Sequence, residues 1–133
     1  MEMQKEIKAD KKKRSGWVRA LEILLRTGHI GSTGVVFGGA LFAIPFARLI
    51  PWHQMAIATG AGLVVLGICQ SRHWPYQLRG VMAITHVGLF GLVRFFPEYR
   101  VQLLAAVLVL GAIGSHMPSG IRHWSLVHGR RID

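Results

Sequence analysis

The segment GHIGSTGVVFGGALFAIPFA, residues 28–47, contains no charged side chain and lies between Arg26 and Arg48. Three later segments share this lack of charge and also have basic residues at both ends: Arg48 to Arg72, Arg79 to Arg94 and Arg100 to Arg122, with Glu98 placed in a turn between them. Apolar segments of this kind are typical of transmembrane helices. The sequence therefore predicts an all-α integral membrane protein.

The overall composition supports this prediction. The chain of 133 residues has 16 Lys and Arg against 6 Asp and Glu, yet 51% of its residues are hydrophobic and its mean hydropathy is +0.37. A large excess of basic residues and a positive mean hydropathy occur together in one chain only when charged and apolar residues occupy different segments. The length predicts one domain. Because the basic residues flank apolar segments and are not interleaved with aromatic residues on a soluble face, we expect no nucleic-acid partner.

Several kinds of chemistry are excluded by what the sequence lacks. Cys69 is the single cysteine, so no intramolecular disulfide forms, and no Cys/His spacing suits structural zinc. No nucleophile–base pair, phosphate-binding glycine loop or pair of carboxylates is present. We expect no self-contained catalytic centre and, at most, an electron-transfer component. The charged N-terminus also lacks a signal-cleavage pattern, so Met1 to Asp133 is expected to be the mature chain.

The expected organisation is an integral membrane four-helix bundle of two hairpins in parallel orientation. Its four spans are residues 28–47, 55–70, 80–96 and 101–117, which together form a transmembrane domain at 28–117. Residues 1–15 are expected to be a basic tail, residues 16–27 an amphipathic helix at the membrane interface, and residues 118–133 a second tail. Pro51, Pro75 and Pro97 fall in the three expected connections.

Basic residues predict the orientation. Thirteen Lys and Arg residues fall in residues 1–27, in the second connection and in the C-terminal tail, against three near the other connections, Arg48, Arg94 and Arg100. The positive-inside rule then places both termini in the cytoplasm, in a membrane that we expect to be a bacterial inner membrane. The bilayer is the first expected partner, and anionic lipid is expected at the basic tails.

Histidines are the main polar residues of the predicted spans, which contain no Asp or Glu. The lack of an acid argues against an ion-coupled transporter. His29, His73, His86 and His116 all fall on the cytoplasmic side of the predicted topology, whereas His53, His123 and His128 fall in a loop and a tail and are expected to be solvated.

Depth in the membrane selects two of these histidines. His86 follows Arg79 by seven residues and His116 precedes Arg122 by six, so each lies roughly 10 Å along its helix from a basic flank. Two level histidines on neighbouring helices can hold a b-type haem between them. His29 is the substitute ligand. The alternative is that these imidazoles only bond to backbone carbonyls or to Ser and Thr.

Two further residue sets carry alternatives. Cys69, Met82 and Met117 could bind Cu(I) together with imidazole. Gly31, Gly34 and Gly38 form a stripe on the face opposite His29, where small residues let another helix approach closely. This stripe predicts packing, and with it a homo-oligomer or a partner in a membrane complex.

Local repeats and resemblances also involve the histidines. His29-Ile-Gly-Ser-Thr-Gly34 is echoed by His86-Val-Gly-Leu-Phe-Gly91. His29 followed by Gly38-Gly39 resembles the first helix of copper-resistance D-type and related cytochrome b561-like membrane proteins. The segment His116-Met-Pro-Ser-Gly-Ile-Arg-His123 resembles the His-x-x-x-Gly-Ile-Arg-His signature of the succinate dehydrogenase cytochrome b anchor, and this resemblance implies that His116 is a haem ligand. Both resembled families bind haem in a membrane.

The leading expectation is therefore a small inner-membrane protein that binds one b-type haem through His86 and His116, as an electron-transfer module or a membrane anchor. The first alternative is a non-catalytic membrane subunit or scaffold that packs against a larger complex and binds no cofactor. The second is copper handling.

Overall fold

Helices make up most of the chain, which confirms the all-α prediction. The computed structural model describes residues 1–132, apart from the side chains of residues 8–15. Its elements, in chain order, are α1 (Glu2–Leu41), α2 (Phe46–Gln70), η1 (Trp74–Tyr76), α3 (Leu78–Leu92), η2 (Pro97–Tyr99), α4 (Arg100–His116), α5 (Ser119–Arg122), β1 (Trp124–Ser125) and β2 (Arg130–Arg131).

Helix α1 extends over regions that the sequence divided into three. It runs without interruption from Glu2 to Leu41, through the expected tail, the expected interfacial helix and most of the first span. Most of the expected basic tail falls on residues 8–15, whose side chains lie outside the described part of the chain. In the amphipathic region, Trp17 and Leu24 are exposed, in keeping with a helix that meets an interface.

The first turn lies earlier than expected, at residues 42–45. Ala43 has a φ of 56°, and Pro45 precedes α2 with a φ of −53°. The region from Arg48 to His53, expected to be a connection, is helical, and Pro51 lies inside α2. An exposed arginine is compatible with a helix surface, and a proline near a helix start costs one backbone hydrogen bond without ending the helix. Charge and proline were therefore misleading boundary signals here.

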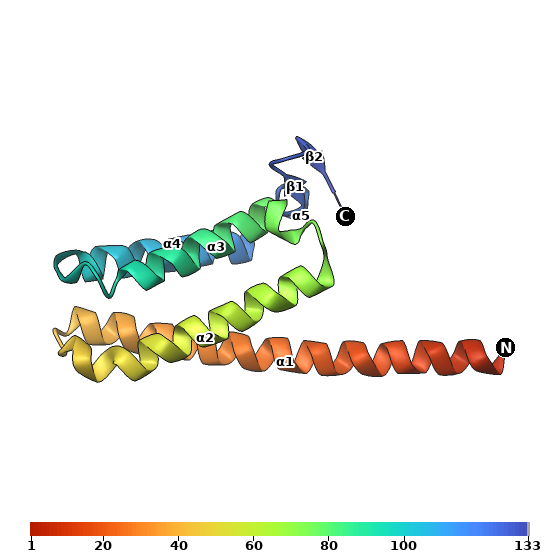
Figure 1. The fold of residues 1–133 in the computed structure, drawn as a ribbon, viewed down its shortest axis with the longest axis horizontal. Coiled ribbons are helices and arrows are strands. Elements are labelled where there is room, and N and C mark those ends of the chain that lie inside the picture. The colour runs from red at the N-terminus through yellow and green to blue at the C-terminus, as the bar shows by residue number, and fades with distance from the viewer. Residues whose placement is uncertain (133) are drawn as a thin grey trace.

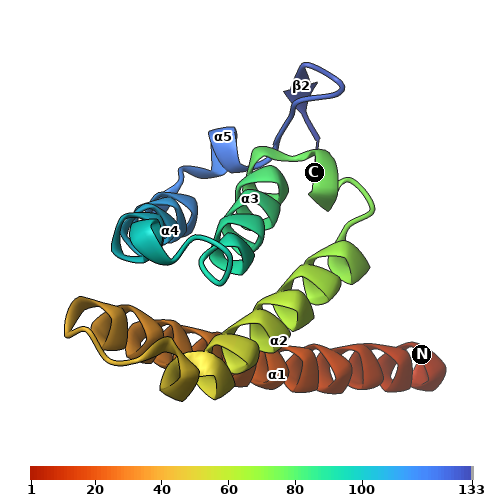
Figure 2. The same cartoon turned by 60° about the vertical axis from the view of Figure 1, so that its left-hand side comes forward.

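The helices α1 to α4 form two antiparallel hairpins, α1–α2 and α3–α4. Both hairpin turns lie at one end of the molecule, which we call the turn end, and both ends of the described chain lie at the other, the terminal end (Figure 1). The hairpins stack as two layers (Figure 2). Because α1 and α3 each contact both α2 and α4, α1 and α3 face each other diagonally across the interior.

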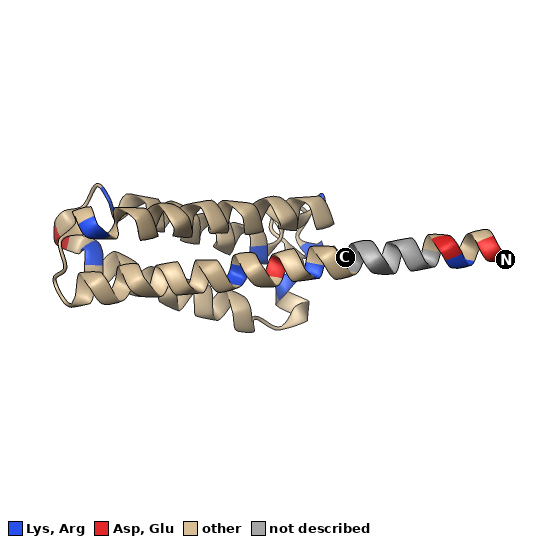
Figure 3. Ribbon diagram, turned by 90° about the horizontal axis from the view of Figure 1, so that it is seen from below, with Lys and Arg blue, Asp and Glu red and all other residues tan. Residues whose placement is uncertain are grey.

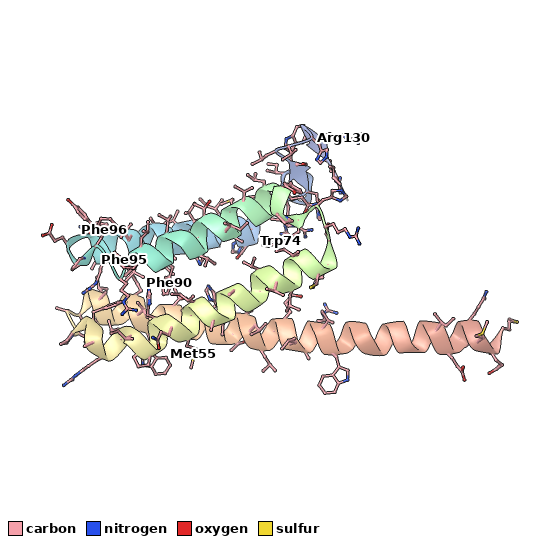
Figure 4. All side chains as sticks on the ribbon, viewed as in Figure 1. Met55, Trp74, Phe90, Phe95, Phe96 and Arg130 are labelled. Atoms are coloured by element: carbon pink, nitrogen blue, oxygen red, sulfur yellow. The ribbon has the colours of Figure 1, made fainter. Side chains whose placement is uncertain are left out.

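The buried apolar core lies toward the turn end and joins the two layers. In Figure 4, Phe90 lies between the hairpins, while Phe95 and Phe96 mark the turn end. All four helices contribute to this core, which consists of Val36, Ala56, Phe90, Val93, Leu104 and Val107. The core therefore fixes one end of the assembly.

Two helical segments, Phe46–Gln70 and Pro97–His116, are long and apolar enough to cross a membrane. Helix α3 is also apolar but shorter. Many of their large side chains point outward, and only 22% and 11% of the most apolar windows of the two longer segments are buried.

The expected C-terminal tail, residues 118–133, is folded over its described part, and it packs on the α2–α3 connection. Strands β1 and β2 pair antiparallel, and Ser125 also bridges to Gln77. The Leu126 N–H donates to the Tyr76 carbonyl at 2.9 Å, and Gln77 Nε2 donates to the Ile132 carbonyl at 2.8 Å. Gln77 and Ser125 are fully buried. This segment thus closes the terminal end of the molecule.

Candidate functional site: a histidine pair between the hairpins

His29 of α1 and His86 of α3 meet in the interior, each from one hairpin. Their Nε2 atoms are 3.4 Å apart, and their ring centroids are 5.7 Å apart with the planes inclined at 52°. Both rings are partly buried. The diagonal placement of α1 and α3 brings these side chains together, although the residues are far apart in sequence.

Hydrogen bonding orients the His29 ring. Its Nδ1 lies 2.8 Å from the Ala56 carbonyl and 3.3 Å from Thr59 Oγ1. Since a carbonyl only accepts, Nδ1 carries the proton and donates it to Ala56. Nε2 of His29 is then left with its lone pair directed at His86. Metal-binding histidines are commonly oriented by this kind of bond to a backbone carbonyl.

His86 completes the pair from the other side. With the lone pair of His29 facing it, His86 Nε2 carries a proton and donates it to His29. Its Nδ1 is buried and has no hydrogen-bond partner among the described residues. Thr33 Oγ1, one turn beyond His29 on α1, is likewise buried and unpartnered. The interior thus keeps polar atoms whose bonding capacity is unused.

Each histidine packs over a glycine of the other helix in its own hairpin. A Cβ on Gly60 of α2 would lie 3.0 Å from His29 Cε1, and a Cβ on Gly111 of α4 would lie 3.1 Å from His86 Cε1. A larger residue at either position would push the ring out of place. The two hairpins therefore build the same His-over-Gly contact, and the local sequence echo between His29 and His86 has this structural counterpart.

The other residues proposed from the sequence lie apart from this pair. His116 is exposed at the end of α4, and its Nδ1 donates to the Ala112 carbonyl of its own helix at 2.9 Å. Cys69 is exposed, Met117 is buried, and Met82 lies one turn before His86. Within the described part of the chain, no group of three or more His, Cys, Asp or Glu residues is placed to hold a metal ion.

His53, expected to be solvated, is buried, and that expectation is wrong. Its ring stacks on Phe90 with centroids 4.8 Å apart, and its Nε2 donates to the Phe90 carbonyl at 2.9 Å. The expectation followed from placing residue 53 in a connection. Once α2 begins at Phe46, His53, Ala56 and Gly60 recur at spacings of three and four and define one buried helix face.

The glycine stripe of α1 faces away from the interior. A Cβ added to Gly31, Gly34 or Gly38 would meet no atom within 4 Å, whereas the neighbouring Ser32 and Val36 are buried. Among the described residues, no other helix packs closely against this stripe.

Comparison of the chain with protein-family models, with curated proteins and with solved structures found no match.

Proposed function

We propose that the chain is a four-span membrane protein that binds one b-type haem through His29 and His86, as an electron-transfer module or a membrane anchor. The observation that carries this proposal is the approach of the two Nε2 atoms to 3.4 Å between the hairpins. The structure thus favours His29 as the partner of His86. His116 lies exposed at a helix end.

The membrane part of the proposal is supported by the apolar helix surfaces. The core helix of a soluble protein is mostly buried, whereas the apolar windows of Phe46–Gln70 and Pro97–His116 are 22% and 11% buried. Lys and Arg gather toward the two ends of the hairpins, with long uncharged stretches between them (Figure 3). Helix α3 has 15 residues, about 22 Å of helix, so residues beyond its two ends would have to complete its span.

The same charges support the orientation. The cations of the α2–α3 connection and of the C-terminal segment lie at the terminal end with the start of α1, while Arg48, Arg94 and Arg100 lie near the turns. By the positive-inside rule, the terminal end faces the cytoplasm. We extend this to a bacterial inner membrane.

The number of available ligands favours haem over a bare ion. A structural or catalytic metal ion commonly takes three or four protein ligands, and no such group exists among the described residues. A haem brings its own nitrogen ligands to the iron, so His29 and His86 would be the two residues that hold it.

To hold a haem, His29 and His86 would have to give up the hydrogen bond between their Nε2 atoms, which are 3.4 Å apart here. Val36, Phe90, Val93 and Leu104 of the core lie nearer the turns than His29 and His86, whereas Ala56 and Val107 lie level with the pair. The hairpins can therefore separate at the terminal side of the pair while the core keeps them joined.

Each group of the chain has a role in this arrangement. Haem supplies one-electron chemistry when bound. The Ala56 carbonyl holds the proton of His29 on Nδ1 and would leave its Nε2 free to bind the iron, whereas His86 would bind only after its proton moved from Nε2 to Nδ1. Gly60 and Gly111 leave room for the two rings. The apolar helices exclude water from the site.

The test is the reduced-minus-oxidised visible spectrum of the full chain, expressed with ample haem and purified in detergent. We expect a sharp alpha band in the wild type, its loss in His29→Ala and in His86→Ala, and its retention in His116→Ala. A featureless wild-type spectrum would contradict the haem proposal. Loss in His116→Ala with retention in His29→Ala would replace the ligand pair by His86 and His116.

A second function has its own supporting observation. The His29–His86 contact is itself a hydrogen bond, so it can act as a link between the hairpins of a non-catalytic membrane subunit or scaffold. The outward face of Gly31, Gly34 and Gly38 would then be open to another membrane helix. This function predicts a featureless spectrum together with a lower melting temperature in His29→Ala.

A further inference from the structure

The terminal end of the molecule carries a polar cavity in the α2–α3 connection. It has a volume of about 430 Å³ and is lined by Gln70, Ser71, Arg72, His73 and Arg79. The pocket is open to the surface along most of its extent. Every lining residue is polar and two are arginines, the side chain best suited to phosphate groups. From this cavity we infer that the connection binds a phosphate group, supplied by the headgroup of an anionic membrane lipid.

Arg79 is held in place by a chain of buried contacts. Its Nε donates to Gln77 Oε1 at 2.6 Å, and Gln77 Nε2 donates to the Ile132 carbonyl at 2.8 Å. Gln77 is fully buried. The C-terminal segment thus positions the guanidinium before any ligand arrives, and a preorganised group loses less conformational freedom on binding.

The surroundings of the cavity are strongly cationic. The C-terminal segment brings Arg122, Arg130 and Arg131 to the terminal end, where Figure 4 shows Arg130 in the strand pair on the same end of the molecule as Trp74. From residue 70 to residue 97, and again from residue 99 to residue 132, the sequence contains no Asp or Glu. Asp133 lies outside the described residues.

The position of the cavity selects lipid as the source of the phosphate. This step rests on the membrane-spanning part of the proposed function and is independent of haem. The cavity lies where α2 ends and α3 begins, which is the depth of lipid headgroups for two spanning helices. Tyr76 and Trp124, at this same end, are 49% and 45% exposed, as expected of aromatic side chains at a membrane interface.

The test is the thermal unfolding of the full chain in detergent with added phosphatidylglycerol, phosphatidylcholine or inorganic phosphate. We expect phosphatidylglycerol to raise the Tm of the wild type and phosphatidylcholine to leave it unchanged. In Arg72→Ala the rise should fall to less than half. Arg72 is exposed, so this substitution leaves no cavity in the core. Arg48→Ala, an equally exposed arginine near the turns, is the matched control and should keep the full rise.

A second variant separates charge from folding. Arg79→Ala removes the bond to Gln77 and can lower the Tm by itself, so the readout is the rise caused by lipid and not the starting Tm. Arg79→Lys keeps the charge and should retain more of this rise than Arg79→Ala. An equal rise in wild type, Arg72→Ala and Arg79→Ala would overturn the site. Equal protection by inorganic phosphate at the same concentration would support a phosphate site and overturn lipid as its source.

The outcome is independent of the haem experiment. Arg72→Ala should keep the visible spectrum of the wild type, whatever that spectrum is. A featureless wild-type spectrum together with the expected lipid dependence would therefore contradict the haem proposal and support the phosphate site.

Discussion

His53 shows how a single buried side chain completes the end of another helix. Its Nε2 donates to the carbonyl of Phe90, near the C-terminal end of α3. The last four carbonyls of a helix have no partner within the helix, and in an apolar environment each needs one. Arg100 plays a similar part just beyond α3, where its Nε donates to the Val93 carbonyl at 3.2 Å. Side chains from α2 and α4 thus stabilise the end of α3.

Replacement of His53 tests this role. His53→Leu fills similar space but leaves the buried Phe90 carbonyl without its donor, so we expect the free energy of unfolding to fall by about 1–3 kcal/mol. His116→Ala is the control, because His116 is exposed, and it should change stability by less than about 0.5 kcal/mol. Denaturant unfolding in detergent measures both. Equal stability of the two variants would show that the Phe90 carbonyl does not need His53.

The candidate site was only partly predictable at this scale. The sequence identified His29 and His86 because imidazoles are conspicuous in uncharged segments, and their depth follows from the rise of a helix. The sequence paired His86 with His116 because the position of a residue along the chain predicts only its depth along a helix. Which side chains meet depends on the rotation of each helix about its axis, and packing sets that rotation.

At the scale of elements, a glycine allows the close return of η1 over the start of α3. A Cβ on Gly80 would overlap the Trp74 carbonyl oxygen and lie 2.8 Å from the Trp74 carbonyl carbon and 3.1 Å from Pro75 Cα. These are backbone atoms, so no side-chain movement relieves the overlap. The α2–α3 connection therefore requires glycine at this position.

This requirement gives a matched pair of substitutions within α3. Gly80→Ala should lower the free energy of unfolding by about 1–3 kcal/mol or more, because the connection has to shift. Gly88→Ala, where a Cβ meets nothing within 4 Å, should be neutral or stabilising by up to about 1 kcal/mol, since alanine favours the helix. Denaturant titrations of both variants measure the difference. An unchanged free energy of unfolding in Gly80→Ala would mean that the α2–α3 connection has room for a Cβ at this position.

Element boundaries were predictable where composition changes abruptly. The expected fourth span, 101–117, differs by one residue at each end from α4, Arg100–His116. The expected third span extended to residue 96, whereas α3 ends at Leu92 and the chain turns before η2. The first turn was missed because Pro45 and Pro51 are both plausible ends, and only the positive φ of Ala43 in the folded chain separates them.

At the scale of the whole molecule, the parallel hairpins predict a topology that labelling can measure. Cys69 is the single cysteine, is exposed, and lies near the terminal end. Glu98 is exposed in η2 at the turn end. A membrane-impermeant maleimide added to intact cells should therefore react with a Cys69→Ala, Glu98→Cys double variant and spare the wild type. After permeabilisation both should react.

The control is Cys69→Ala alone, which should stay unlabelled in either condition. Labelling of wild-type Cys69 in intact cells would reverse the proposed orientation. Labelling of both positions without permeabilisation would contradict the placement of the two turns on the side opposite the termini.

The sequence alone determined that this chain is helical and that its helices carry long apolar surfaces, because these properties follow from composition and from the spacing of charges along the chain. It also identified the histidines available to a buried site. Only the tertiary structure decided that His29 meets His86, that His53 is buried, and that the C-terminal segment positions Arg79 through Gln77. These contacts join residues far apart in sequence, and each depends on helix rotation and on glycine positions that let neighbouring groups approach.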